Sequence, residues 1–381
     1  MTPRPILAGT PGSFARAVFH ERHPKLIERV LRALPYPPAQ RAALEELLTE
    51  STTGVMQPLS EDTADRERWL ARGAEHYGKP WGDAPFLWAE SFFYRRLLEA
   101  TGYHRPGPWR GIDPFAPFKT AELHGATVTG QLGSLGDVDR DRLLLACLWG
   151  NRADLGFQLT ATESETSDAL LIDDSALLWS MLEDAPRLDV IADNAGAELL
   201  PDLILIDHLL TAGTVPEIRL WVKPAPYYVS DATTADVLAI LALLRDTATS
   251  LGRRLEDHIT TARLSIDTHE FFCAPLLFAE MPDDLATELA GAQVTVLKGD
   301  LNYRRLVGDL DWPATTPFAE TVQPFPAPVV ALRTLKSDVV VGLSAEQETA
   351  LDTREPGWRT RGTHALISAA PGRIHRREGR R

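Results

Sequence analysis

The sequence lacks several features that mark membrane-spanning and secreted proteins. No apolar run approaches the ~18 residues that a membrane span needs, and the N-terminus has no basic-then-apolar signal pattern. Only two cysteines occur, Cys147 and Cys273, and their spacing is not that of metal ligands. We expect both to be reduced rather than paired. These absences predict a cytoplasmic protein with no membrane partner.

Positive charge is also scarce. The 381-residue chain has 39 Lys and Arg against 53 Asp and Glu, which gives a formal net charge of −14. A nucleic-acid partner would need a basic face, so this balance argues against one. An anionic substrate must then be held by local cations, and only six of the basic residues are lysines: Lys25, Lys79, Lys119, Lys223, Lys298 and Lys336.

Strand patterns are missing from roughly the first 120 residues. Helical periodicity runs through 15–34, interrupted by Pro24, and through 38–50, 62–77 and 86–100. The aromatic residues of 86–100 recur at helical spacing, so we expect them to pack into a core. With ~150 residues per domain as a guide, we predict a helical N-terminal region over 1–125, a core over 126–370 and a disordered basic tail over 371–381.

Strands alternate with helices over the next 200 residues, which predicts an α/β core with a mostly parallel sheet and helices on both faces. The turn after strand 188–192 is the centre of this pattern, because Asp193 and Asn194 stand where the strand ends and a helix follows. The expected strands are 169–173, 188–192, 218–222, 264–267, one beginning at 294, and a final pair flanking 333–336. The expected helices are 137–148, 175–183, 233–251 and 282–289.

Polar groups follow three of these strands: Asp193 with Asn194, Asp231, and the K-G-D segment 298–300. Parallel strands present their carboxyl ends to one edge, so these groups could converge. Taken singly, the Asp-Asn pair is more often a helix cap, and an isolated Asp is more often a turn residue. Gathering Asp193, Asp231 and Asp300 would cost free energy through charge repulsion unless a cation joined them. Carboxylate and amide oxygens suit a hard divalent ion.

Six motifs in order along the chain resemble the damage-control phosphatase family, first catalogued as domain of unknown function 89. They are W-A-E-x-x-x-Y-R-R at 88–96, G-N-R-x-D-L at 150–155, D-N-x-G-x-E at 193–198, K-P-x-P-x-x-V-S-D at 223–231, K-G-D-L-N-Y-R at 298–304 and R-T-x-K at 333–336. The last motif is typical of the branch that includes the acidic-residue methyltransferase-1-like proteins. The resemblance covers nearly the whole chain, and the tail after Gly372 lies outside it.

The resemblance implies an α/β/α Rossmann-like core with a helical N-terminal region, and a phosphatase acting on sugar phosphates such as fructose 1-phosphate or fructose 6-phosphate. It also implies a divalent metal ion held by Asp193, Asn194 and Asp231. Physical argument does not choose among Mn²⁺, Mg²⁺, Co²⁺ and Ni²⁺, since mixed oxygen sites bind several of them. Direct attack by water and a covalent aspartyl-phosphate both stay open.

Two further hypotheses assign roles around the metal. Asp193 or Asp300 would orient or deprotonate the attacking water, whereas Glu198 is already explained by the helix dipole. Lys336, with Arg333, Asp300, Asn151 and the Gly299 backbone, would hold the substrate phosphate.

The alternative for Arg333 is a structural fork that ties a strand to a carboxylate. Because a strand-end loop residue supports little packing, Asp231→Ala is expected to abolish activity and leave the fold intact.

Two other functions compete with the phosphatase. An S-adenosylmethionine-dependent protein-carboxylate methyltransferase should need a Gly-rich nucleotide turn, and the sequence has no G-x-G-x-x-G. A metal-stabilised binding domain would not need acid, amide and lysine groups gathered at strand ends. The sequence therefore favours the phosphatase, with a small phosphorylated metabolite as its partner.

Overall fold

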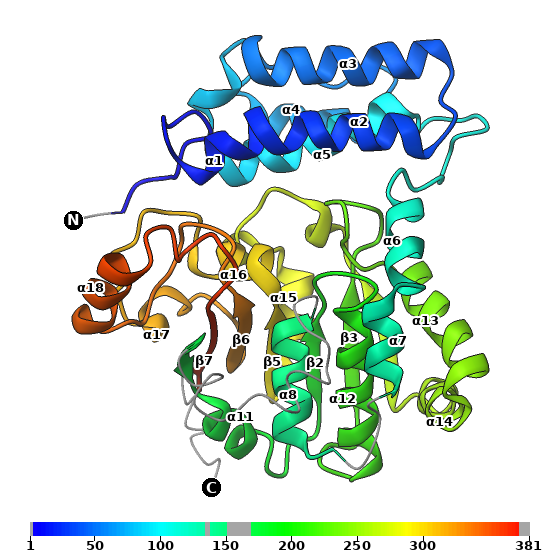
Figure 1. Ribbon diagram of the computed structural model, residues 1–381, viewed down its shortest axis with the longest axis vertical. Helices are drawn as coiled ribbons and strands as arrows, with labels where there is room; N and C mark the ends of the chain where they lie inside the picture. The colour runs from blue at the N-terminus through cyan, green and yellow to red at the C-terminus, as the bar shows by residue number, and fades with distance from the viewer. Residues whose placement is uncertain (1–2, 134–137, 151–168, 373–381) are drawn as a thin grey trace, which may run out of the picture.

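A seven-stranded sheet forms the centre of the protein. The computed structural model describes residues 3–133, 138–150 and 169–372, and Figure 1 shows a bundle of helices standing at one end of an α/β part. The strands are β1 (Leu170–Asp173), β2 (Leu188–Ile191), β3 (Ile218–Val222), β4 (Leu264–Thr268), β5 (Val294–Lys298), β6 (Val329–Thr334) and β7 (Ala365–Ala370), in the order β1-β7-β6-β5-β2-β3-β4. Every pairing is parallel except that of β6 with β7.

Helices cover both faces of this sheet, because strand side chains alternate between two apolar layers. In β6, Val330 and Leu332 pack in one layer, while Val329 and Ala331 pack in the other. The first layer includes residues of α6 (Ala116–Leu123), α7 (Ala126–Gly133), α8 (Arg140–Trp149), α11 (Ser175–Met181), α12 (Leu199–Thr211), α13 (Thr234–Thr247) and α14 (Thr249–Thr260). The second includes residues of α15 (Asp283–Ala290), α16 (Gly299–Val307), α17 (Phe318–Thr321), α18 (Ala345–Arg354) and the 3-10 turns Glu270–Cys273 and Phe278–Glu280. The predicted three-layer α/β/α class is confirmed.

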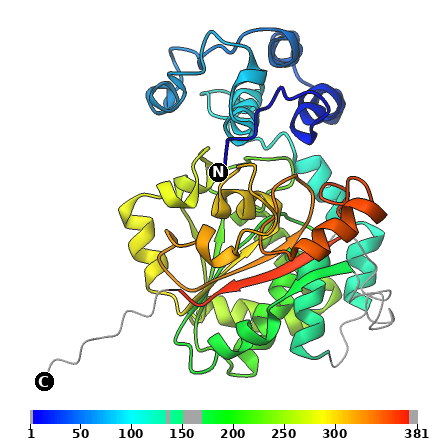
Figure 2. The same cartoon turned by 90° about the vertical axis from the view of Figure 1, so that its left-hand side faces the viewer.

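The bundle at the end of the sheet, here called the cap, comprises residues 3–115. Its helices are α1 (Phe14–Ala17), α2 (His23–Ala33), α3 (Pro38–Thr53), α4 (Arg66–Gly73) and α5 (Phe86–Thr101), joined by the π turn Val18–Arg22 and the 3-10 turn Trp81–Asp83. Helix α5 is the centre of the cap, with 13 of its 16 residues buried. Its aromatic residues pack in the cap's own apolar cluster, as expected. Figure 2 shows the cap above the α/β part from a second side.

Three local expectations differ from the structure. Pro24 does not interrupt the first helical run, because it lies in the first turn of α2, where its missing N–H is tolerated. The expected helix 233–251 is two helices that part at Ala248, and α14 turns back so closely that a Cβ on Gly252 would lie 3.2 Å from Leu244. The strand expected directly after Lys336 is absent from the described residues, and β6 pairs with β5 on one side and with β7, farther along the chain, on the other.

Over the part of the chain that the structure describes, no helix has the length and apolar character needed to cross a membrane.

Candidate active site

The carboxyl edge of the sheet contains a topological switch point. Strand β2 lies between β5 and β3 and pairs in parallel with both. From β2 the chain goes to β3 and β4 on one side, and it later returns to β5 on the other. In open α/β sheets, ligands bind in the crevice that forms where connections diverge in this way. Asp193 and Asn194 follow β2 and Gly299 follows β5, so two of the sequence motifs lie at this point.

The Asp193 carboxylate is buried at the switch point against the backbone of Gly299. Gly299 has a φ of +83°, and a Cβ there would lie 1.8 Å from Asp193 Oδ2. Only glycine allows the two segments to approach so closely. Burial raises the pKa of Asp193 well above its usual range, and the carboxylates of Glu198 and Asp231 raise it further. Negative charge is therefore poorly compensated at the centre of the site.

The Asn194 side chain links the groups around Asp193. Its Nδ2 donates to Asp193 Oδ2 and to Glu198 Oε2, each at 3.0 Å. Its Oδ1 accepts a hydrogen bond from Ser230 Oγ at 2.8 Å. The amide therefore holds two carboxylates close together and is fixed in turn by the loop after β3.

Asp231 reaches the same place through backbone pairing of the loops after β2 and β3. Asn194 and Asp231 form an isolated antiparallel bridge, and the Ala232 N–H donates to the Asp193 carbonyl at 2.8 Å. Asp231 is 1% exposed and lies 3.9 Å from Lys223 Nζ. An alanine at 231 would leave a buried lysine without this partner, so the expectation of an intact fold is revised. Asparagine is the better substitution for Asp231.

Asp300, in the first turn of α16, is held from the side of β6. Its Oδ1 accepts from Arg333 Nε at 2.8 Å and forms an ion pair with Arg333 NH2 at 2.7 Å. The same oxygen accepts from the Lys336 N–H at 3.2 Å and from Ser337 Oγ at 3.1 Å. Burial alone would raise the pKa of Asp300, but the guanidinium groups of Arg333 and Arg304 outweigh it and lower that pKa. Asp300 is therefore an ionised carboxylate near neutral pH.

Arg333 is fully buried among protein groups. Beside its contacts to Asp300, NH1 donates to the Val339 carbonyl, NH2 donates to Ser337 Oγ at 2.9 Å, and the guanidinium stacks on the Tyr303 ring at 4.2 Å. All three of its nitrogens are engaged by protein groups. The structure therefore favours the alternative role, in which Arg333 supports Asp300.

Among the residues that the structure describes, Lys336 is the accessible cation of the site. Its side chain is 44% exposed, and its Nζ lies 3.4 Å from Glu198 Oε1. Glu198, followed by Asp193, raises the pKa of Lys336, which keeps it protonated. Lys298 has no such access, because it is buried and pairs with Asp202 at 2.6 Å. Asn151, the remaining predicted phosphate contact, lies outside the described residues.

Sequence reasoning missed Glu122 on α6. Its Oε1 accepts from the Ala197 N–H at 3.3 Å, and it lies against Gly196, where a Cβ would be 3.1 Å from its Cδ. Burial raises the pKa of Glu122, and Glu198 raises it further. No motif contains Glu122, and its approach to the turn after β2 is a tertiary contact of α6 that the local sequence pattern does not show. Behind Gly196, a cleft of about 350 Å³ runs between α6 and α13 and is lined in part by Lys119, Lys223 and Asp236.

The residues around Asp193 fit a hard divalent cation. Across 3–133, 138–150 and 169–372, no three His, Cys, Asp or Glu side chains are grouped as metal ligands. A site here would therefore need the amide oxygen of Asn194, which accepts from Ser230 Oγ in this structure, beside the carboxylates of Asp193 and Asp231. Such an oxygen set is what hard cations prefer. The buried carboxylate beside two others supports the fit, because a cation would relieve their repulsion.

Fold and site together define a Rossmann-like α/β enzyme core whose charged groups gather at the switch point beneath a helical cap. Residues 18–351 match the family model of the damage-control phosphatase ARMT1-like domain. The chain belongs to this family. It is therefore a phosphatase, and the family supports a role in metabolite repair.

Named relatives and a solved structure agree with this assignment. Damage-control phosphatase ARMT1 of Bos taurus is 30% identical, over 96% of this chain and 98% of its own length. The protein of the same name from Homo sapiens is 31% identical, over 75% of this chain and 74% of its own. A crystal structure of a DUF89 family protein from Pyrococcus horikoshii superposes with a TM-score of 0.51 at 15% identity, over 92% of this chain and 96% of that one. This last similarity concerns the fold alone.

Proposed function

We propose that this phosphatase hydrolyses phosphomonoesters of sugar phosphates, such as fructose 1-phosphate or fructose 6-phosphate. We further propose that it uses one divalent ion, Mn²⁺, Mg²⁺, Co²⁺ or Ni²⁺, held by Asp193, Asn194 and Asp231. A cytoplasmic location is part of the proposal and is supported by two unpaired cysteines.

The excess of negative charge around the switch point is the main support for the proposed metal ion. Among the described residues, the five carboxylates of Asp193, Asp231, Asp300, Glu198 and Glu122 gather around the switch point and outnumber the four cations that act on them, Lys223, Lys336, Arg333 and Arg304. A phosphate monoester is itself anionic, so these carboxylates would repel it. A divalent ion among them reverses the local charge where the phosphoryl group must bind.

The protein's own groups then have separate tasks. The bound ion would screen phosphoryl oxygens and make a nearby water more acidic. Asp300, ionised and held from one side by Arg333, orients that water or accepts its proton. Lys336, exposed and protonated, contacts the phosphoryl oxygens. Gly299 begins α16, so the N-terminal dipole of this helix also favours an anion.

A phosphate-release screen tests this function. Purified protein is treated with a chelator, and a panel of sugar phosphates is then assayed with each of the four metals restored. We expect activity to vanish with the chelator and to return with at least one metal, and Asp231→Asn to remain inactive at every metal concentration. Release that persists after exhaustive chelation would remove the metal from the proposal. Activity on other phosphomonoesters but not on sugar phosphates would remove the substrate class.

A further inference from the structure

One buried carboxylate of the cap, that of Glu90 on α5, contacts two segments of the candidate site at once. Glu90 is 7% exposed, and its Oε2 accepts from Arg304 NH1 at 2.9 Å and from the Tyr228 hydroxyl at 3.4 Å. Arg304 belongs to α16, and Tyr228 belongs to the loop after β3. A single oxygen on the cap therefore joins the two segments that supply Asp300 and Asp231.

The first link runs through Tyr228. At one end its hydroxyl is near Glu90 and lies 3.3 Å from Ser91 Oγ, and its ring packs on Tyr94 with 4.5 Å between centroids. At the other end its backbone N–H donates to Asp231 Oδ2 at 3.2 Å. Three contacts with α5 thus fix a residue whose backbone orients the Asp231 carboxylate.

The second link runs through Arg304, one helical turn after Asp300. Arg304 binds two carboxylates. Its NH1 donates to Glu90, and its Nε and NH2 donate to the two oxygens of Asp309 at 2.8 and 2.9 Å. Asp309 Oδ2 accepts the Leu87 N–H at 3.0 Å, so it caps the first turn of α5. The start of α5 is therefore fixed to the same helix that begins with Gly299 and Asp300.

We propose that Glu90 is a positioning residue, which transmits the seating of the cap on the sheet to Asp231 through Tyr228 and to Asp300 through Arg304. The inference rests on the proposed metal-dependent function, since Asp231 is one of the proposed ligands. Groups that orient metal ligands from behind commonly change metal affinity or activity by about 10–100-fold when they are altered.

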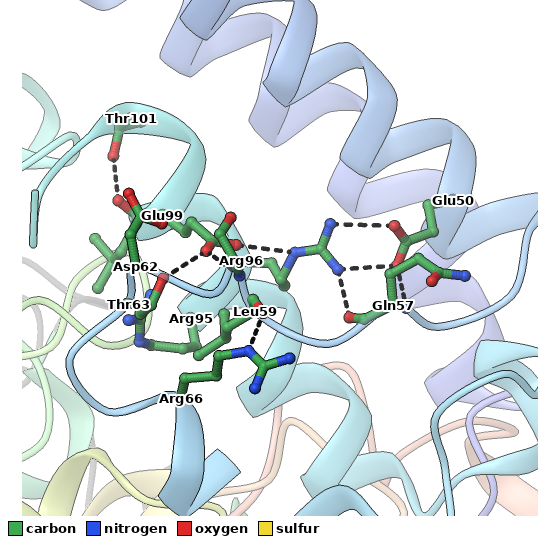
Figure 3. Close-up of polar contacts among 12 residues, drawn as sticks. Glu50, Gln57, Leu59, Asp62, Thr63, Arg66, Arg95, Arg96, Glu99 and Thr101 are labelled. Atoms are coloured by element: carbon green, nitrogen blue, oxygen red, sulfur yellow. Dashed lines mark hydrogen bonds and ion pairs between the residues drawn. The ribbon is translucent and has the colours of Figure 1, made fainter. Parts of the chain in front are cut away.

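A polar network inside the cap provides a matched control. Arg96, also on α5, makes a two-pronged contact with Glu50 of α3, with NH1 and NH2 each 3.1 Å from a carboxylate oxygen, and its Nε lies 3.3 Å from Glu99 (Figure 3). The side-chain partners of Glu50 among the described residues, Arg96, Gln57 and Trp81, all belong to the cap. Glu50→Gln therefore removes a charge from a partly buried arginine pair on α5 without touching the site.

The experiment compares Glu90→Gln, Tyr228→Phe, their double variant and Glu50→Gln in the full chain. Mn²⁺ binding is measured by calorimetry, melting temperature is measured without metal, and kcat and KM are measured on a sugar phosphate. We expect Glu90→Gln and Tyr228→Phe each to weaken Mn²⁺ binding about tenfold. The Mn²⁺ affinity of the double variant should equal that of whichever single variant binds Mn²⁺ less tightly. The two losses should not add, because Glu90 acts on Asp231 through Tyr228.

The control separates positioning from stability. Glu50→Gln should lower the melting temperature while Mn²⁺ affinity stays that of the wild type. If Glu90→Gln does not fold, Tyr228→Phe carries the test, since it removes one hydroxyl and leaves the backbone donor to Asp231 in place. Wild-type Mn²⁺ affinity in Tyr228→Phe would overturn the inference while leaving the proposed function standing. A wild-type protein that binds none of Mn²⁺, Mg²⁺, Co²⁺ and Ni²⁺ would overturn the proposed metal dependence, and the inference with it.

Discussion

Replacing Gly299 by alanine tests whether the site depends on the close approach of β5 to Asp193. An added Cβ would lie 1.8 Å from Oδ2, 2.1 Å from Cγ and 2.7 Å from Cβ of Asp193. Real Cβ contacts essentially never fall below 3.0 Å, so the carboxylate or the chain must retreat by at least the difference between 3.0 and 1.8 Å. Asp193 is bridged by Asn194 and paired through its carbonyl to the loop after β3, so it cannot retreat alone.

The size of the effect follows from that displacement. A shift of about 1 Å in a catalytic group can cost on the order of 10²-fold in rate, so we expect kcat/KM of Gly299→Ala to fall about 100-fold. The positive φ of +83° adds a backbone cost of roughly 1–2 kcal/mol to any L-residue there. Gly213 separates the two effects, because its φ is +71° and an added Cβ would meet nothing within 4 Å.

The assay is steady-state kinetics with melting temperature on both variants. Gly213→Ala should lose stability through its backbone alone and keep wild-type kcat/KM, whereas Gly299→Ala should lose activity even at temperatures where it is fully folded. Wild-type kinetics in a folded Gly299→Ala protein would refute the reasoning, because it would mean that the position of Asp193 does not matter to the chemistry.

Three further predictions concern single side chains. Lys336→Met keeps the length of the side chain and removes its charge, so kcat/KM should fall by about 10²-fold at fixed metal, and an unchanged value would remove Lys336 from the site. Asp300→Asn should lower kcat more than Mn²⁺ affinity, whereas an equal loss of both in kinetics and calorimetry would reassign it as a ligand. His23 is buried, with no partner for either ring nitrogen among the described residues, and burial lowers its pKa to about 3, whereas histidine in an unfolded chain titrates near 6.5. As the pH falls, the unfolded state therefore takes up this proton before the folded state does. The contribution of neutral His23 to the free energy of unfolding is complete above about pH 6.5 and falls by about 1.4 kcal/mol per pH unit toward pH 3. Denaturant titrations at several pH values should show a smaller dependence of the unfolding free energy on pH in His23→Phe, and the same dependence in both proteins would contradict this prediction.

The fold was predictable where apolar residues alternate locally. The expected strand 218–222 coincides with β3, and the strands of the sheet place alternate residues in two separate apolar layers. The break at Ala248 has no such signal, because neither Gly nor Pro marks it and the cause is packing of α14 back on α13. The position of strand β7 was not predicted for a related reason. It begins about 30 residues after β6 ends, and the apolar pattern around β6 does not show which distant segment pairs with it.

Only the part of the candidate site that lies at the ends of neighbouring parallel strands was predictable from the sequence. Asp193, Asn194 and Asp231 come together because parallel strands share one edge, a rule that needs no knowledge of side-chain contacts. The roles of Arg333 and Glu122 do not follow from any such rule. Arg333 could have faced either a ligand or Asp300, and only its burial and its partners decide between them.

Helical geometry also divides a motif that reads as one unit in the sequence. In W-A-E-x-x-x-Y-R-R, Glu90 is followed by Arg95 and Arg96 at spacings of five and six residues, which at about 100° per residue lie roughly 140° and 240° around α5. Side chains so far apart cannot serve one site. Glu90 accordingly reaches Arg304 on α16, whereas Arg95 pairs with Asp65 at 2.9 Å and Arg96 pairs with Glu50, both inside the cap. The two arginines therefore hold the cap together around α5, whereas Glu90 joins the cap to the candidate site. Substitutions of Arg95 or Arg96 should consequently lower stability and leave metal affinity unchanged, whereas substitution of Glu90 should lower metal affinity.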